Sequence, residues 1–112
     1  MDASEYQRRT RATAIYADNI PATSALAYVA LGLNGEAGEV AEHVKKAIRD
    51  DGGQVSEARR QLLVGELGDV CWYLASCCEE LGLDLGEVME ANLAKLASRK
   101  ERGVLGGAGS TR

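Results

Sequence analysis

Apolar residues recur at intervals of three and four along most of the chain, the spacing that places them on one face of an α-helix. Four such segments are predicted, at residues 4–16, 24–49, 56–81 and 84–102. Turn-forming sequence separates them: the only proline, Pro21, follows the first segment, and glycines follow the second and third. Because short connections between long helices favour antiparallel neighbours, the pattern predicts an all-α four-helix bundle.

The predicted helix ends carry capping residues. Thr23 or Ser24 can begin the second helix and Ser56 the third, because their hydroxyls accept hydrogen bonds from free backbone N–H groups. Asp84 can begin the fourth, with a glutamate three residues later at the spacing of a capping box. Residues 1–103 therefore form one helical domain. Residues 104–112 are rich in glycine and have no periodicity, so we expect a flexible tail.

Composition narrows the class of protein. Phenylalanine is absent and aromatic residues make up 4% of the chain, so aliphatic side chains build the core, as is typical of helices packed on helices. The 112 residues leave room for a single domain. The formal net charge of −4 provides no basic surplus to neutralise the phosphates of a nucleic-acid polymer. DNA and RNA are therefore not expected as partners.

Cysteine usage and hydropathy indicate the compartment. Cys71, Cys77 and Cys78 are odd in number and form no C-x-x-C motif, so we interpret them as reduced, buried, small apolar residues in a reducing cytosol. No apolar run approaches the roughly 18 residues of a membrane span. The first 11 residues are charged, unlike a secretory signal. A cytoplasmic protein without a membrane anchor is expected.

Two five-residue segments are nearly identical, GEAGE at residues 35–39 and GELGD at residues 65–69. Each places two carboxylates three residues apart, on one face of a predicted helix. Each also places two glycines inside that helix, at a cost of roughly 1 kcal/mol per glycine relative to alanine. We therefore expect close backbone approach beside the acids, and we take these segments as the candidate site.

The helical pattern predicts where these acids point. Glu36 lies at the edge of the apolar stripe of its helix, and Glu66 lies within the stripe of the next. Glu39 and Asp69 lie on the flanks of the same stripes. A carboxylate at a core position is unfavourable unless something compensates its charge.

Two kinds of compensation are open. The first is a set of buried salt bridges or protonated acids, although basic residues are scarce on these faces. The second is a hard divalent cation, which suits a site made of several carboxylates. The absence of a histidine and cysteine cluster argues against zinc. We favour the divalent cation.

The pattern E-x-x-E followed by E-x-x-D, with its glycines and spacing, resembles that of the MazG-like nucleoside triphosphate pyrophosphohydrolases. The segment N-x-x-K-L-x-x-R at residues 92–99 resembles the closing helix of the same family. The resemblance extends from about residue 24 to the end and places the chain among the all-α NTP pyrophosphatases, which include the dimeric dUTPases. It implies Mg²⁺-dependent hydrolysis of a nucleoside triphosphate to the monophosphate and pyrophosphate, with Mn²⁺ as a possible substitute.

Carried over by motif, the resemblance assigns both metal binding and catalysis to the four acids Glu36, Glu39, Glu66 and Asp69. One of them can act as general base instead of a full ligand, and the sequence does not distinguish which.

The resemblance also implies that the closing helix binds substrate. Asn92, Lys95 and Arg99 lie on one face of it and would contact the phosphates or the sugar. The alternative is that the two cations pair with surface glutamates.

Three further residues near the acids are secondary candidates for substrate binding. Tyr73 lies one turn after Asp69 and would approach a base, whereas Trp72 is interpreted as a core or interface residue. His43 lies one turn after Glu39, and Lys46 lies near the end of the same helix. For His43 the alternative is a surface or capping role.

Two functions are therefore compared. The first is a nucleotide-pool house-cleaning enzyme that converts an NTP or dNTP to its monophosphate, and the second is a catalytically silent nucleotide- or metal-binding regulatory module on the same bundle. The chain is short for a bundle with charged core positions, so we expect a homo-oligomer, a dimer or a tetramer. The preferred base and sugar are left open.

Overall fold

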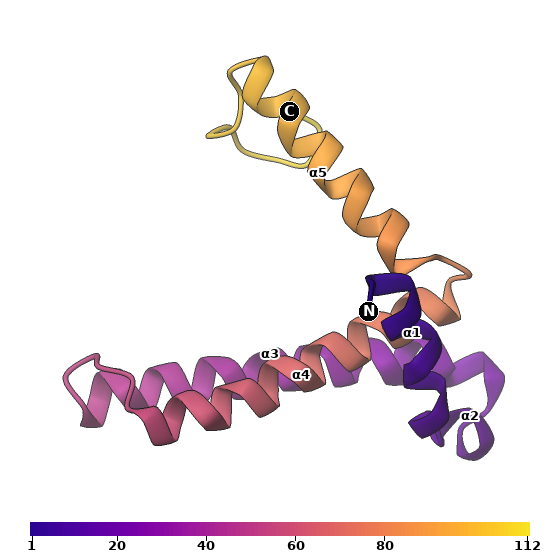
Figure 1. Cartoon of the computed structure of the whole chain (residues 1–112), viewed down its shortest axis with the longest axis horizontal. Helices are drawn as coiled ribbons and strands as arrows, with labels where there is room; N and C mark the ends of the chain where they lie inside the picture. The colour runs from indigo at the N-terminus through magenta and orange to yellow at the C-terminus, as the bar shows by residue number, and fades with distance from the viewer.

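The computed structural model describes residues 1–112 and contains only helices and the turns between them. Figure 1 shows two long helices side by side, with a third leaving them at one end. The α-helices are α1 (Ala3–Thr10), α2 (Tyr16–Asn19), α3 (Ala25–Asp50), α4 (Glu57–Glu80) and α5 (Leu85–Glu101). The all-α class is confirmed. None of these helices combines the length and the apolar character needed to cross a bilayer.

The capping residues explain where the later helices begin and end. The Ser56 side chain accepts a hydrogen bond from the Arg59 N–H, and the Asp84 carboxylate accepts one from the Glu87 N–H, as the sequence predicts. The helix α4 stops at a glycine, Gly82, whose φ of 66° lies in the left-handed region that favours this residue. The hydroxyl of Ser24, by contrast, makes no capping bond to α3.

The continuous first helix expected over residues 4–16 is wrong. The helix α1 ends at Thr10, a 3₁₀ turn covers Arg11–Thr13, and α2 begins only at Tyr16. The hydroxyls of Thr10 and Thr13 donate to the carbonyls of Gln7 and Thr10, a local bonding pattern that competes with helix propagation. This break turns the chain back toward α4.

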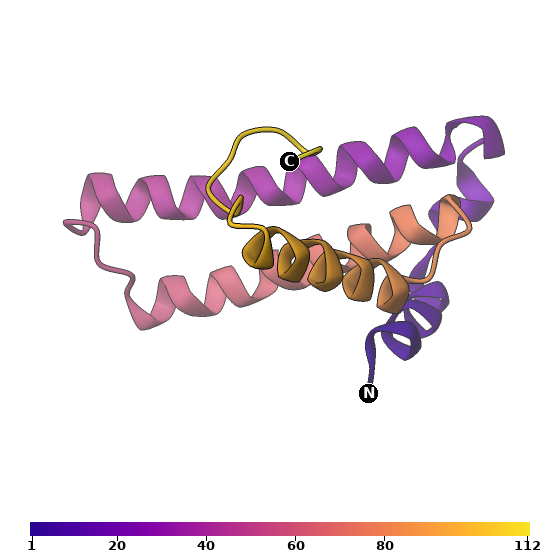
Figure 2. The ribbon, with the colours of Figure 1, turned by 90° about the horizontal axis from the view of Figure 1, so that it is seen from above.

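The long helices α3 and α4 form an antiparallel hairpin, and α1 packs across the distal end of α4 (Figures 1 and 2). Gln7 anchors α1 there, because its amide donates to the Leu83 carbonyl at 2.9 Å and accepts from the Leu85 N–H at 2.6 Å. The helix α5 leaves the junction and diverges from the hairpin. The expected four-helix bundle is therefore not closed within one chain.

The core is small for a chain of this length. Only 11 of the 112 residues are buried. The buried hydrophobic residues form two clusters of 3 residues each, one around Val29 and Tyr16 and one around Ala75 and Leu85. The radius of gyration is 17.0 Å, whereas a compact domain of this length is expected near 13 Å. The accessible surface is 7639 Å², against about 5,900 Å² for a folded monomer of this mass. Much apolar surface is left uncovered.

The burial of the cysteines differs from the sequence-based expectation. All three cysteines are free, as predicted, but only Cys78 is buried, and Cys71 is exposed. The tail over residues 104–112 folds back on the end of α5, where the Arg112 side chain donates to the carbonyl of Val104 at 3.1 Å. This contact places the tail beside α5, and the flexibility of the tail stays a prediction.

Candidate carboxylate site

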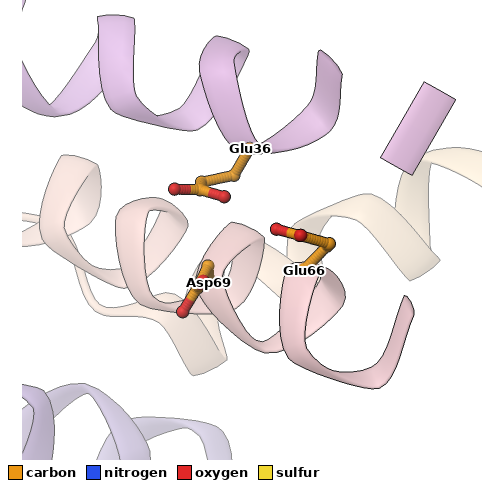
Figure 3. A group of neighbouring side chains, drawn as sticks. All are labelled: Glu36, Glu66 and Asp69. Carbon is orange, nitrogen blue, oxygen red and sulfur yellow. The ribbon is translucent and has the colours of Figure 1, made fainter. Parts of the chain in front are cut away.

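Three carboxylates from the two long helices converge on one point. Glu36 comes from α3, and Glu66 and Asp69 come from α4; each offers an oxygen such that all three oxygens lie within 4.8 Å of one another. Figure 3 shows Glu36 reaching from its helix toward the two acids of the neighbouring helix. The antiparallel pairing of α3 and α4 therefore brings together acids that are thirty residues apart in sequence.

Burial follows the predicted helical faces. Glu36 and Glu66, placed at or within the apolar stripes, are half-buried, whereas Glu39 and Asp69, placed on the flanks, are exposed. The prediction of one inward and one flanking acid per helix is confirmed. Asp69 still reaches the cluster, but Glu39 lies outside it. The structure thus gathers three of the four predicted acids.

The charge of the cluster is poorly compensated. The pKa of the Glu36 carboxyl is raised, first by desolvation, then by its hydrogen bond with Glu66 and by the negative charge of Asp69. The nearest basic group is His43, whose Nε2 lies 3.5 Å from the Glu66 Oε1. No lysine or arginine forms an ion pair with any of the three acids. The salt-bridge alternative is therefore weak, and the site has a deficit of positive charge.

His43 was a secondary candidate for substrate binding, and the structure places it against the cluster. Its side chain is largely buried, and its Nδ1 has no hydrogen-bond partner. The Nε2 contact with Glu66 makes it a neighbour of the carboxylates instead of a surface residue.

The glycines beside the acids do not have the role that the sequence suggested. A Cβ added at Gly35, Gly38, Gly65 or Gly68 would meet no atom within 4 Å, so no close backbone approach occurs at these positions within one chain. Instead the close approach is at Gly32, one turn earlier on α3, where a Cβ would overlap the ring of Tyr73.

A cavity of about 430 Å³ opens beside the acids. Its walls are Glu36, Asp69, Thr13, Trp72 and Tyr73, so it joins two carboxylates to an aromatic pair. The Trp72 and Tyr73 rings meet edge to face with centroids 5.1 Å apart. Burial, above all, raises the pKa of the Tyr73 phenol above its usual value. The volume is in the range of small-molecule sites.

The sequence predicted Tyr73 near the site. The core interpretation of Trp72 agrees with its packing against the cluster of Tyr16, Ala25 and Val29, but it did not include the cavity that Trp72 also lines, and Thr13 was not predicted. The signal for Trp72 was its position three residues after Asp69, on the same helical face. Thr13 had no such signal, because it reaches the cavity only through the turn after α1.

The remaining candidates lie apart from the carboxylates. Asn92 and Lys95 are exposed on the diverging α5. Arg99 is 5% exposed beneath the tail and donates to the Ser110 carbonyl at 2.8 Å. Lys46, on α3, is half-buried and takes part in no ion pair. Within one chain, therefore, no lysine or arginine faces the cavity beside the acids.

The donor set suits a hard cation. The site offers three carboxylates with converging oxygens, one imidazole at its edge and no thiolate. Mg²⁺ and Mn²⁺ prefer oxygen ligands of this kind, whereas zinc prefers histidine and cysteine. The raised pKa of Glu36 is the sign of a charge that the protein itself does not balance. These residues fit a divalent ion.

The protein is thus an all-α hairpin with clustered carboxylates beside a cavity that has aromatic walls. It belongs to the class of helical proteins with an acidic site suited to a cation. Comparison with known proteins identifies the family. The family model described as the MazG nucleotide pyrophosphohydrolase domain matches residues 25–104, which is most of the chain. The chain therefore belongs to the MazG family, whose members are hydrolases of nucleoside triphosphates.

One relative matches along its entire length. The gene 37 protein of Mycobacterium phage L5 is 45% identical over 114 residues, with both chains fully covered. No solved structure matches the chain. The resemblance seen in the sequence is thus confirmed at the level of the family.

Proposed function

We propose that this protein is a Mg²⁺-dependent nucleoside triphosphate pyrophosphohydrolase that converts an NTP or dNTP to its monophosphate and pyrophosphate in house-cleaning of the nucleotide pool. The observation that carries the proposal is the convergence of the Glu36, Glu66 and Asp69 oxygens within 4.8 Å at the edge of a cavity. Membership of the MazG family supports the substrate class. The three free cysteines support a cytoplasmic location.

In this proposal Glu36, Glu66 and Asp69 hold the cation. A bound Mg²⁺ neutralises phosphate oxygens and activates the attacking water. Glu39, one turn along α3 from Glu36 and open to solvent, serves as a further ligand or as the general base. His43 orients the Glu66 carboxylate through its Nε2.

We further propose that the active form is a homo-oligomer. The observations in favour are the divergence of α5, the large accessible surface and the apolar side chains exposed on all three long helices. Those with half or more of their area exposed include Leu31, Ile48, Leu62, Val64, Leu67 and Leu93. An assembly of two or four copies would bury this surface and close the helical bundle between chains.

An oligomer would also explain why one chain has no lysine or arginine beside the acids. A triphosphate carries several negative charges, and the cavity beside the acids has no lysine or arginine in its walls. We propose that Asn92, Lys95 and Arg99 supply phosphate or sugar contacts once α5 packs against a hairpin, within the assembly. Light scattering coupled to size-exclusion chromatography tests the assembly, and a monomer at micromolar concentration would contradict it.

The activity is tested with a panel of NTPs and dNTPs incubated with Mg²⁺, Mn²⁺ or EDTA, with product separation. We expect monophosphate and pyrophosphate with either metal and none with EDTA. Diphosphate and phosphate as products would contradict the proposal. The panel also identifies the preferred base and sugar.

A catalytically silent binding module is the second candidate, and the position of Glu39 outside the acid cluster favours it. It predicts metal-dependent nucleotide binding without turnover in the same panel. Isothermal titration establishes nucleotide binding for either candidate, and the assay for pyrophosphate then separates the two, because only the enzyme releases it.

A further inference from the structure

The indole of Trp72 is held from two sides by the segment that follows α1. Its Nε1–H donates to the Thr13 Oγ1 at 2.9 Å, and the Thr13 hydroxyl donates in turn to the Thr10 carbonyl at 3.1 Å. The Arg11 guanidinium lies 5.8 Å from the centroid of the Trp72 ring. This segment lies before residue 25, outside the part of the chain that the family model matches.

Arg11 is itself tightly fixed. Its guanidinium donates to the Ser76 Oγ at 2.7 Å and to the Tyr16 Oη at 3.1 Å, and Tyr16 donates to the Glu80 carboxylate at 2.8 Å. Ser76 is fully buried on α4. A network of charge-assisted bonds therefore joins the turn after α1 to α4 and sets the position of the Trp72 ring.

The anchored ring is not enclosed by protein. Trp72 and Thr13 together line the cavity beside the acids and a second cavity of about 340 Å³ on the side of α1. A structural tryptophan in a core has close contacts all round, because protein interiors are close-packed. Trp72 instead packs on one side against the buried cluster of Tyr16, Ala25 and Val29, and on its open side it lines the two cavities.

We propose that Trp72 is the residue on which the nucleobase of the substrate stacks, and that Thr13 and Arg11 are positioning residues that hold its ring for this contact. The inference rests on the proposed function, because it assumes a nucleotide whose phosphates lie at Glu36 and Asp69. The same cavity is lined by both of those acids and by Trp72 and Tyr73. An aromatic face accepts any base, so this contact supplies affinity. Discrimination between bases then comes from polar groups around the ring.

The only tryptophan in the chain is Trp72, so its fluorescence reports on this site alone. The probe is a nucleoside triphosphate with a non-hydrolysable α,β-imido linkage, added with Mg²⁺. Inorganic tripolyphosphate is the matched ligand that lacks a base. We expect the nucleotide to quench or shift the emission and tripolyphosphate to bind without doing so. Equal responses to both ligands would overturn the inference.

Variants separate stacking from simple packing. Trp72→Leu removes the aromatic face, and a stacking contact corresponds to about a 5- to 150-fold weaker binding when it is lost. We expect that increase in KM with little change in kcat, whereas Trp72→Phe keeps a face and stays near the wild type. A KM for the leucine variant equal to that of the wild type would overturn the inference.

The positioning role of Thr13 is tested by two variants. Thr13→Val removes the acceptor for the indole N–H, and Thr13→Ser keeps it. We expect the valine variant to raise KM and to lose the base-dependent fluorescence change, and the serine variant to restore both. Identical behaviour of the two variants would refute a positioning role for Thr13.

Failure of this inference is distinguishable from failure of the proposed function. Turnover of nucleotides by the wild type with no base-dependent emission change would remove only the role of Trp72. Absence of both turnover and nucleotide binding would remove the proposed function itself.

Discussion

Replacing Glu36 by glutamine is the sharpest test of the carboxylate site, because it affects stability in opposite directions with and without metal. The glutamine keeps the size of the side chain and removes one of three negative charges whose oxygens lie within 4.8 Å of one another. In the metal-free protein that charge is repelled by Glu66 and Asp69 and is partly desolvated. We therefore expect Glu36→Gln to stabilise the metal-free fold.

The magnitude follows from Coulomb's law. The three oxygens lie within 4.8 Å of one another. At that upper limit two unit charges repel by about 0.9 kcal/mol in a water-like dielectric, the appropriate limit for a half-exposed site. Screening at physiological salt reduces each pair to about 0.5 kcal/mol. Glu36 takes part in two pairs, so its neutralisation is worth about 1 kcal/mol, or roughly 4 °C in Tm for a chain of this size.

The pH dependence has a defined sign. The pKa of Glu36 is raised in the folded state, so the folded protein binds a proton more tightly than the unfolded chain does. Wild-type stability therefore falls as the pH rises from the unfolded pKa through the folded one. The advantage of Glu36→Gln is expected at neutral pH and absent at about pH 3, well below both pKa values.

Thermal unfolding followed by circular dichroism, in EDTA and in Mg²⁺, measures these effects. Wild-type protein gains about 1.4 kcal/mol at a Mg²⁺ concentration ten times its Kd, and the variant, which lacks a ligand, gains much less. Glu90→Gln, an exposed substitution on α5, is the matched control and should change neither quantity. A lower Tm for Glu36→Gln in EDTA, or an undiminished response to Mg²⁺, would refute the reasoning.

Three further predictions concern packing, chemistry and assembly. Gly32→Ala should lower the free energy of unfolding in urea by about 1–3 kcal/mol, because the added Cβ overlaps the Tyr73 ring. Gly65→Ala faces open space and should raise that free energy by about 1 kcal/mol. Equal effects of the two variants would contradict these roles of the glycines. Asp69→Asn should reduce kcat at least 100-fold with unchanged helicity, and full activity would remove Asp69 from the site. Leu93→Lys, at a position 62% exposed in one chain, should shift the oligomer toward monomer in light scattering; an unchanged mass would place the interface elsewhere.

The local parts of the site were predictable because they depend on helix geometry alone. A carboxylate pair three residues apart shares a helical face whatever the rest of the chain does, so the inward positions of Glu36 and Glu66 followed from periodicity. The capping roles of Ser56 and Asp84 followed in the same way from single side chains beside free N–H groups. Family membership could be inferred for a related reason, since its motifs are short and contiguous.

The features that sequence reasoning missed depend on contacts between distant segments. Thr13 reaches the cavity because the helix breaks after Thr10 and Arg11 is bonded to Ser76, a contact across sixty-five residues. The divergence of α5 and the separation of Glu39 from the other acids likewise reflect how helices pack, which periodicity does not specify.

The sequence by itself determined that this protein is all-α, that paired acids lie on two helical faces, and that its motifs are those of a MazG hydrolase. The tertiary structure decided which three acids meet, which glycine allows a close approach, and that Trp72 lines a cavity as well as packing against the core. The physical reason is the sequence separation of the residues involved. The direction of a side chain along a helix is set within one turn, whereas the contact between two helices is set by the packing of the whole chain.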